Sequence, residues 1–322
     1  MKNGFLIHLA AKIRRNTIKW RVASAMLAGT ALLFAFQGFS RAENDDEHDA
    51  TPFTDCTVPI SNPGLYFLTM DLKQCVSGIS ITVSDVKLEL RGHTVQGVAG
   101  TTGRVISVDG GGTVLSGIEI AGPGTVTGGT TGIDFEDVHG SRVHNLIVSG
   151  NLFDGIVVNV SIPTNASPTS TDHASHDNQF IGNVVTGNGN NGITITGGTN
   201  DEFLDNVVAG NLAYGISVNN SNANSFLHNN LSGNQADGLF LGFNNSTADS
   251  NVVRGNTADS NTANGIHVGP GMLIFGNKIE DNTALGNPLF AQNPGYDLND
   301  ESSNCINMYS NNSFNTKAGC VP

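Results

Sequence analysis

Three carboxylates fall at matching places in two neighbouring strand-like segments of this sequence. Asp109 lies in the segment that follows Gly103, and Asp134 and Glu136 lie in the segment that follows Gly132. If the segments are adjacent strands, alternate residues share a face about 6.6 Å apart and the strands lie about 4.8 Å apart. Acid pairs of glycoside-cleaving enzymes use separations of roughly 5 to 9.5 Å. The three residues are therefore candidates for general acid–base chemistry.

The same carboxylates could instead hold a cation. Like charges at this spacing raise one another's pKa or recruit a cation, and a dense set of oxygen ligands suits Ca²⁺. Asp109, Asp134 and Glu136 are thus also the expected ligands of Ca²⁺, and no other cofactor is expected. The remaining alternative is an ordinary solvated strip on an acidic protein.

Other polar and aromatic residues are expected near these acids or further along the same face. Residues 160–177 include an insertion rich in Ser, Thr, Pro and Asn, and insertions in repeat proteins become loops on one face. Folded over the acids, this loop would bring in two histidines, which are also a candidate Zn²⁺ or Cu²⁺ pair unless they are simply solvated. An exposed aromatic ring further along would stack on a sugar. The candidate ligand contacts are Asp154, Asn159, His173, His176, Tyr214 and Phe240.

A repeat sets the elements that must position these residues. The phrase Asn183–Asn188 followed by Gly192–Ile195 recurs 23 residues later, and once more after a further 23. A fixed period of this length, with short Val and Ile runs and Gly or Asn at the corners, predicts an all-β solenoid, a parallel β-helix. Phe180, Phe203 and Phe226 keep the same step and are expected to stack inside it. Asparagines at the repeated positions are expected to bond to the coils above and below.

Each turn of the solenoid, here called a coil, can be divided at the Gly that precedes a strand. Because side chains alternate, the residues two and four places after that Gly should point outward. The first outward column then runs from Ser80 to His267, and the second runs from Thr82 to Gly269. Asp134 and Phe240 lie in the first column.

Composition limits the partners. Of 322 residues 13% are charged, the formal net charge is −13, and residues 1–42 contain basic residues but no acid. The rest of the chain is therefore strongly acidic, which disfavours nucleic acid and anionic lipid and suits cations or neutral ligands. The expected partner is a polysaccharide or other glycan, bound by a monomer.

The ends of the sequence look different from the repeat. Residues 1–42 are predicted to be a secretory signal, cleaved before Glu43, with an uncleaved anchor as the alternative. Arg14 and Arg15 partly resemble a twin-arginine signal, so both export routes stay open. The protein is expected to be secreted or periplasmic, with no stable membrane span after cleavage. The predicted parts are an acidic linker (43–51), an N-terminal cap (52–77), a β-helix of about eight coils (78–284) and a C-terminal cap (285–322).

Four cysteines lie in the two predicted caps. Export permits disulfides, and although four cysteines allow three pairings, proximity favours Cys56 with Cys75 and Cys305 with Cys320. The two disulfides are expected to staple the caps.

Several segments resemble the bacterial right-handed parallel β-helix repeat proteins, the superfamily of pectate lyases, alginate epimerases and the periplasmic copper-maturation proteins of nitrous oxide reductase. The resemblance lies in Gly78–Val83, Leu88–Val95, the Asn coils described above, and the ending that includes Asp297, Cys305, Asn312–Asn315 and Cys320. It implies a right-handed, single-stranded helix over nearly all of the mature chain. The repeat is scaffold, so the resemblance does not specify an activity.

Two functions remain open. The first is a polysaccharide lyase, epimerase or hydrolase that uses the carboxylate patch, with or without calcium. The second is a non-catalytic envelope or surface protein with a glycan-binding, structural or metal-delivery role. Signature motifs of polygalacturonases and alginate epimerases are not present in the sequence. A pectate-lyase mechanism needs Arg or Lys as its base, and only Arg104 and Arg142 lie close in coil order to the patch.

Overall fold

The computed structural model describes residues 50–160, 175–242, 246–271, 274–287, 289–290 and 293–322. The predictions for the signal (1–42), for most of the linker (43–51) and for His173 lie outside the described residues. The description below concerns the compact unit 48–322. Among its described residues no helix is long and apolar enough to cross a membrane.

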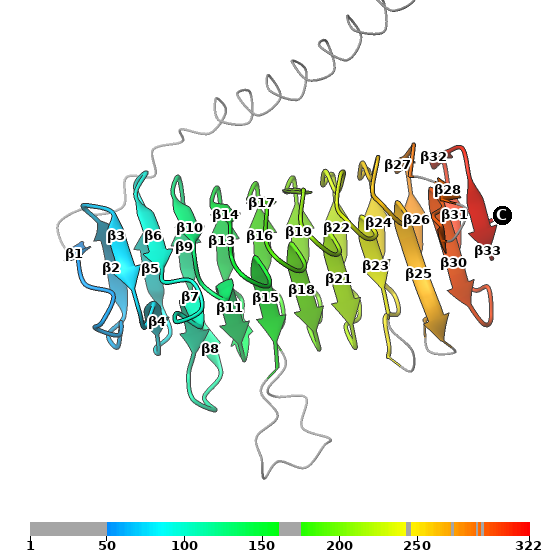
Figure 1. The fold of residues 1–322 in the computed structure, drawn as a ribbon. Coiled ribbons are helices and arrows are strands. Elements are labelled where there is room, and N and C mark those ends of the chain that lie inside the picture. The colour runs from blue at the N-terminus through cyan, green and yellow to red at the C-terminus, as the bar shows by residue number, and fades with distance from the viewer. Residues whose placement is uncertain (1–49, 161–174, 243–245, 272–273, 288, 291–292) are drawn as a thin grey trace, which may run out of the picture. The chain divides into compact units, whose positions relative to one another are not determined.

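The chain winds through three parallel sheets, and two of them, with eleven and ten strands, run along most of the coils, whereas the third ends at β20 (Figure 1). The ten-stranded sheet contains β4 (Ile79–Ile81), β7 (Arg104–Asp109), β11 (Thr131–Glu136), β15 (Ile156–Asn159), β18 (Ile193–Thr196), β21 (Ile216–Asn219), β23 (Leu239–Leu241), β25 (Ile266–Gly271), β30 (Leu298–Ser302) and β33 (Lys317–Gly319). The eleven-stranded sheet contains β1 (Thr51–Phe53), β2 (Gly64–Leu68), β5 (Val86–Glu89), β9 (Glu119–Ala121), β13 (Arg142–His144), β16 (Gln179–Ile181), β19 (Glu202–Leu204), β22 (Ser225–Leu227), β24 (Val252–Arg254), β26 (Lys278–Glu280) and β31 (Met308–Ser310).

The third sheet and three short pairs complete the topology. The six-stranded sheet contains β3 (Leu72–Cys75), β6 (Thr94–Gly97), β10 (Thr125–Thr127), β14 (Ile147–Ser149), β17 (Val184–Thr186) and β20 (Val207–Ala209). The short pairs are β8 (Leu115–Ser116) with β12 (Val138–His139), β27 (Thr283–Ala284) with β32 (Ser313–Phe314), and the antiparallel β28 (Leu289–Phe290) with β29 (Asn293–Pro294). The predicted all-β parallel solenoid is thereby confirmed.

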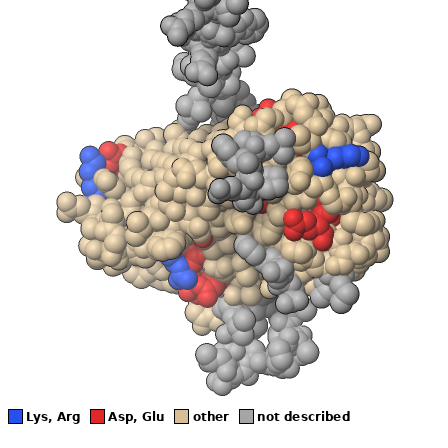
Figure 2. Space-filling view, turned by 45° about the vertical axis from the view of Figure 1, so that its right-hand side comes forward, with Lys and Arg blue, Asp and Glu red and all other residues tan. Residues whose placement is uncertain are grey.

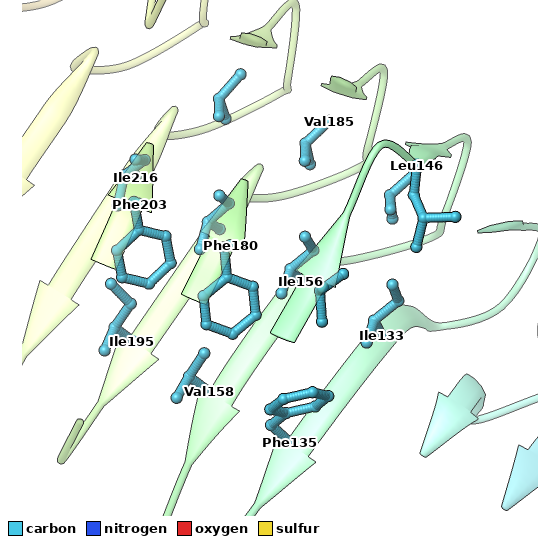
Figure 3. Close-up of a cluster of buried hydrophobic side chains, with 14 of the residues drawn as sticks. Ile133, Phe135, Leu146, Ile156, Val158, Phe180, Val185, Ile195, Phe203 and Ile216 are labelled. Atoms are coloured by element: carbon cyan, nitrogen blue, oxygen red, sulfur yellow. The ribbon is translucent and has the colours of Figure 1, made fainter. Parts of the chain in front are cut away.

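Apolar side chains fill the space between the sheets, as Figure 3 shows for the middle coils. Phe180 and Phe203 stack with ring centroids 4.8 Å apart, and Phe203 and Phe226 stack at 5.2 Å. All three rings are fully buried. The internal aromatic ladder predicted from the 23-residue step is confirmed.

Buried asparagines tie each coil to the next. The backbone N–H and the Nδ2 of Asn183 both donate to Asn206 Oδ1, at 2.9 and 3.1 Å, and Nδ2 also donates to the carbonyl of Val143 at 2.9 Å. Asn188 and Asn211 repeat this arrangement at a second corner. Asparagine suits the position because its amide has both a donor and an acceptor. The predicted asparagine columns are therefore bonded ladders.

Glycine precedes most strands of the ten-stranded sheet because these corners have no room for a side chain. A Cβ on Gly192 would overlap the side chain of Val208, and one on Gly155 would overlap Val185. The close approach of the corner to the core explains why each repeat can be divided at a glycine.

The predicted cap segments carry both predicted disulfides, Cys56–Cys75 and Cys305–Cys320. They also contribute strands to the same sheets, from β1 to β3 at one end and from β30 to β33 at the other. At the C-terminal end the buried carboxylate of Asp297 closes one asparagine ladder by accepting the backbone N–H and Nδ2 of Asn287.

Candidate functional site

The outward face of the ten-stranded sheet carries the predicted columns in the predicted register. Asp134 lies between Ser107 of β7 and Val157 of β15. Glu136 lies between Asp109 and Asn159 in the same two strands. The residues proposed as an acidic patch are therefore brought together on neighbouring strands.

A guanidinium group lies among these carboxylates. Arg104 begins β7, and its Nε contacts Asp134 Oδ2 while its Nη2 lies 3.1 Å from Glu136 Oε2. The sequence pattern did not place Arg104 on this face. Strict alternation fails at the start of β7, where Val105 and Ile106 are both fully buried. Arg104, which the sequence offered only as a residue close in coil order to the patch, therefore lies on this face, and with Asp134 and Glu136 it forms what we call the Arg104 cluster.

Asp134 is the most deeply buried member of this cluster, with 2% of its surface exposed. Burial raises its pKa to about 6; the charge of Arg104 lowers it, and the charges of Glu136 and Asp109 raise it further. Asn159 Nδ2 donates to Asp134 Oδ1 at 3.2 Å. Asp134 is thus a carboxyl that can hold or release a proton close to neutral pH.

A groove of about 710 Å³ lies beside the cluster over β4 and β7. We call it the Arg104 groove. Its polar lining consists of Ser77, Ser80, Thr82, Arg104, Ser107 and Asp109. Asp109 Oδ1 accepts the backbone N–H of Gly111 at 2.7 Å, which fixes the turn at one end of the groove. Arg104 links the two features, because it lines the groove and holds Asp134 and Glu136.

Two of the other predicted contacts lie apart from the cluster. Asp154 Oδ1 accepts Nδ2 of Asn190 at 2.8 Å and the backbone N–H of Asn191 at 2.9 Å, so it ties two coils together. His176 stacks on His139 with centroids 4.9 Å apart, and its Nδ1 lies 2.7 Å from Asp177 Oδ2. The described residues show His176 in contact with its neighbouring coil, and His173 lies outside them.

Phe240 points outward as predicted, but its ring is only 4% exposed. Tyr214 stacks on it at 5.1 Å with an interplanar angle of 13°, and His267 packs against it at 4.8 Å. Side chains in an outward column lean on their neighbours along the coil axis. The expectation of an exposed Phe240 ring for sugar stacking is therefore wrong, and of the two predicted aromatic contacts the partly exposed Tyr214 remains.

Among the described residues no group of three or more His, Cys, Asp or Glu side chains is arranged to hold a metal ion. The cation that the structure places beside Asp134 and Glu136 is the guanidinium of Arg104. Ca²⁺ binding by Asp109, Asp134 and Glu136 stays a prediction. Figure 2 shows that most of the visible surface is uncharged, with acidic and basic side chains in small separate groups.

Comparison with known proteins gives a clear result for the fold. Residues 71–272 match a family model described as a right-handed beta helix region. A search of curated proteins gave no significant match.

Fifteen chains of solved structures match significantly. Tailspike protein 2 of the Escherichia coli O157:H7 bacteriophage CAB120 is 12% identical with a TM-score of 0.53, over 82% of this chain and 33% of that protein. A mutant of the periplasmic alginate epimerase AlgG is 14% identical with a TM-score of 0.46, over 79% of this chain and 62% of that one. The A-module of the Azotobacter vinelandii mannuronan C-5 epimerase AlgE4 is 12% identical with a TM-score of 0.41, over 84% and 86%.

The chain spans less than two thirds of the length of the first two of these proteins. At such identities the likeness concerns the fold alone.

Proposed function

Because the chain belongs to the right-handed β-helix family, whose repeat is a scaffold, we propose a function from the side chains on its outer face: the protein binds and modifies a polysaccharide. The observation that carries this proposal is the cluster in which Arg104 holds Asp134 and Glu136 beside the Arg104 groove.

The cluster supplies two carboxyl groups in different environments, as acid–base chemistry needs. Asp134, with its pKa raised to about 6 mainly by burial, is the proton donor. Glu136 is more exposed than Asp134, and its Oε2 lies 3.1 Å from Nη2 of Arg104. Alternate residues of one strand are about 6.6 Å apart, within the roughly 5 to 9.5 Å that paired carboxyl groups use at a glycosidic bond. Arg104 orients both carboxyl groups.

The rest of the face suits a neutral polar chain. Beyond the cluster, Asn159, Thr196 and Asn219 occupy one outward column on three consecutive coils, and Thr194 lies in the neighbouring column; all four are partly exposed. Each coil advances about 4.8 Å along the axis. A glycan lying along the axis would therefore meet a hydroxyl or amide group on each of these three coils.

The cellular location is part of this proposal. Two disulfides fit an oxidising compartment, because cytosolic thiols are kept reduced. Together with the predicted signal in residues 1–42, they support a secreted or periplasmic protein. Polysaccharides of the envelope or of the surroundings are then the accessible substrates.

One observation favours a second candidate function, glycan binding without turnover. Arg104 pairs with both Asp134 and Glu136, so two of the three acids already share one positive charge within the protein. Calcium would have to displace this guanidinium from the same oxygen atoms. In a purely binding protein the cluster would serve to orient hydroxyl groups.

The two functions are separated by a substrate panel. The chain is incubated with acidic and neutral polysaccharides, with Ca²⁺ or with a chelator, and new reducing ends and unsaturated uronate absorbance are followed. Product formation that is lost in Glu136→Gln supports catalysis at the cluster. Binding without product, equal in Glu136→Gln and in the parent, rejects catalysis there.

A further inference from the structure

A second group of polar residues lies on the same face, about five coils from the Arg104 cluster. The register runs from Asp134 through Val157, Thr194, Ser217 and Phe240 to His267. At about 4.8 Å per coil this corresponds to roughly 24 Å. The second group is therefore separate from the Arg104 groove.

The carboxyl group of Asp237 is held in place by hydrogen bonds to its neighbours. Its carboxyl group is 4% exposed, and Oδ1 accepts the backbone N–H of Asn264 at 2.6 Å and its Nδ2 at 2.8 Å. The other oxygen, Oδ2, lies 2.9 Å from His267 Nδ1. Asn264 Nδ2 also lies 3.3 Å from Nδ1, but the carboxylate is the closer partner and only accepts hydrogen bonds, so in the neutral ring Nδ1 carries the hydrogen and Nε2 is an acceptor.

This acceptor has no hydrogen-bond partner in the part of the chain that the structure describes. His267 Nε2 is buried. The carboxylate oxygen Glu301 Oε1 lies 3.7 Å from it, which is too far for a hydrogen bond. A buried polar atom without a partner is destabilising, so its presence calls for an explanation. The ring is held in place by Phe240 on one side and Asp237 at its edge.

Glu301 is the movable part of the arrangement. Its side chain is 48% exposed, so it can turn aside, while Asn299 Nδ2 donates to its Oε1 at 3.1 Å. The charged groups that contact the His267 ring are Asp237 and Glu301, both acids. A ligand with a negative charge would be repelled, whereas a hydroxyl group could donate to Nε2 and another could donate to Glu301.

We propose that Asp237, His267 and Glu301 form a second ligand site, at which Nε2 of His267 accepts a hydrogen bond from a hydroxyl group of a neutral sugar. Asp237 is a positioning residue that sets the tautomer, and Glu301 accepts a neighbouring hydroxyl group. The site deepens the proposed polysaccharide function, on which it rests, by naming a neutral region of the glycan at this end of the face.

The test uses the full chain with labelled histidine nitrogens, and the neutral probes cellohexaose, maltohexaose and mannohexaose beside a hexamer of polygalacturonate. The expected result is that one neutral probe shifts the Nε2 resonance of His267 and binds in calorimetry. His267→Gln and Glu301→Gln should weaken that binding about tenfold or more. The matched control His228→Asn changes an exposed turn histidine and should bind normally.

The variant Asp237→Asn tests whether Asp237 sets the tautomer of His267, because a purely structural role would leave the nitrogen spectra unchanged. With an amide donor in place of the carboxylate, the ring proton should shift from Nδ1 to Nε2, which the nitrogen spectra detect without any ligand. The proposal is overturned if no neutral probe moves the Nε2 resonance, or if His267→Gln binds as the parent does. Loss of binding in Asp134→Asn but not in His267→Gln would leave the proposed function standing and reject this site.

Discussion

Arg104 Nε in β7 contacts the buried carboxylate oxygen Oδ2 of Asp134 in β11, one coil away along the outer face. The contact joins a 43% exposed cation to a carboxyl group that is almost fully buried. It places a proton-holding acid, its counter-ion and a groove within one region of the ten-stranded sheet.

Replacing Arg104 with Gln should destabilise the protein mainly above neutral pH. The folded-state pKa of Asp134 is raised to about 6, chiefly by burial, so its proton stabilises the fold at low pH and that contribution is lost as the pH rises through 6. Without the guanidinium the folded-state pKa rises further. Urea unfolding of Arg104→Gln should show a loss of about 1–3 kcal/mol at pH 8 and a smaller loss at pH 5.

Arg142→Gln, which changes an exposed arginine in the eleven-stranded sheet, is the control and should change little at either pH. An equal loss at pH 5 and pH 8 in Arg104→Gln would mean that Asp134 is not its partner.

Asp201 is an acid in a column of asparagines, and Asp201→Asn should stabilise the protein. Its backbone N–H donates to Asn224 and its Oδ1 accepts the backbone N–H of Asn178, but its buried Oδ2 has no hydrogen-bond partner among the described residues. Burial raises its pKa to about 7, partly opposed by the hydrogen bonds from Asn178. The stability that the proton of Asp201 gives is fully present at pH values below the pKa that Asp201 has in the unfolded state. It is lost as the pH rises through 7.

Urea unfolding of Asp201→Asn should therefore show a gain of about 1–3 kcal/mol at pH 8 that shrinks towards pH 4. A variant that is less stable than the parent at pH 8 would contradict this account of the ladder.

Phe203→Ala should remove the middle ring of the internal stack. Phe203 is fully buried between Phe180 and Phe226, so truncation leaves a cavity and should cost about 3–5 kcal/mol of unfolding free energy. Leu204→Ala, at the next position and facing outward, is the matched control and should cost much less. Similar losses in the two variants would mean that the alternation in β19 is not as described.

The register of the outer face could be predicted because each coil can be counted from its own Gly, even where the coils differ in length. Ser107 beside Asp134, and Asp109 beside Glu136, follow from counting two and four residues after each Gly, and the strand pairings confirm them. The stacked phenylalanines and the bonded asparagines follow from the same step. These features depend only on period and alternation.

The position of Arg104 and the exposure of Phe240 could not be predicted from the pattern, because each depends on a local exception. Two successive buried residues, Val105 and Ile106, break the alternation and put Arg104 on the face. The exposure of Phe240 depends on how Tyr214 and His267 lean over it. Neither spacing nor residue type encodes these side-chain contacts.

The stacking of His139 on His176 could not be predicted from the sequence for a different reason. The two residues occupy equivalent places on neighbouring coils, but the insertion between 160 and 177 separates them by more than one normal repeat. A count at the regular period therefore does not pair them.

Turnover by Asp134→Asn is the measurement that tests the central claim most directly. The parent, Asp134→Asn and the control Asp205→Asn, an exposed turn residue, are assayed side by side on the polysaccharide that the parent modifies. The account predicts that Asp134→Asn loses activity by roughly a hundredfold or more, as expected for loss of an acid–base group, while Asp205→Asn keeps it. Full activity in Asp134→Asn would contradict the assignment of the Arg104 cluster as the working site.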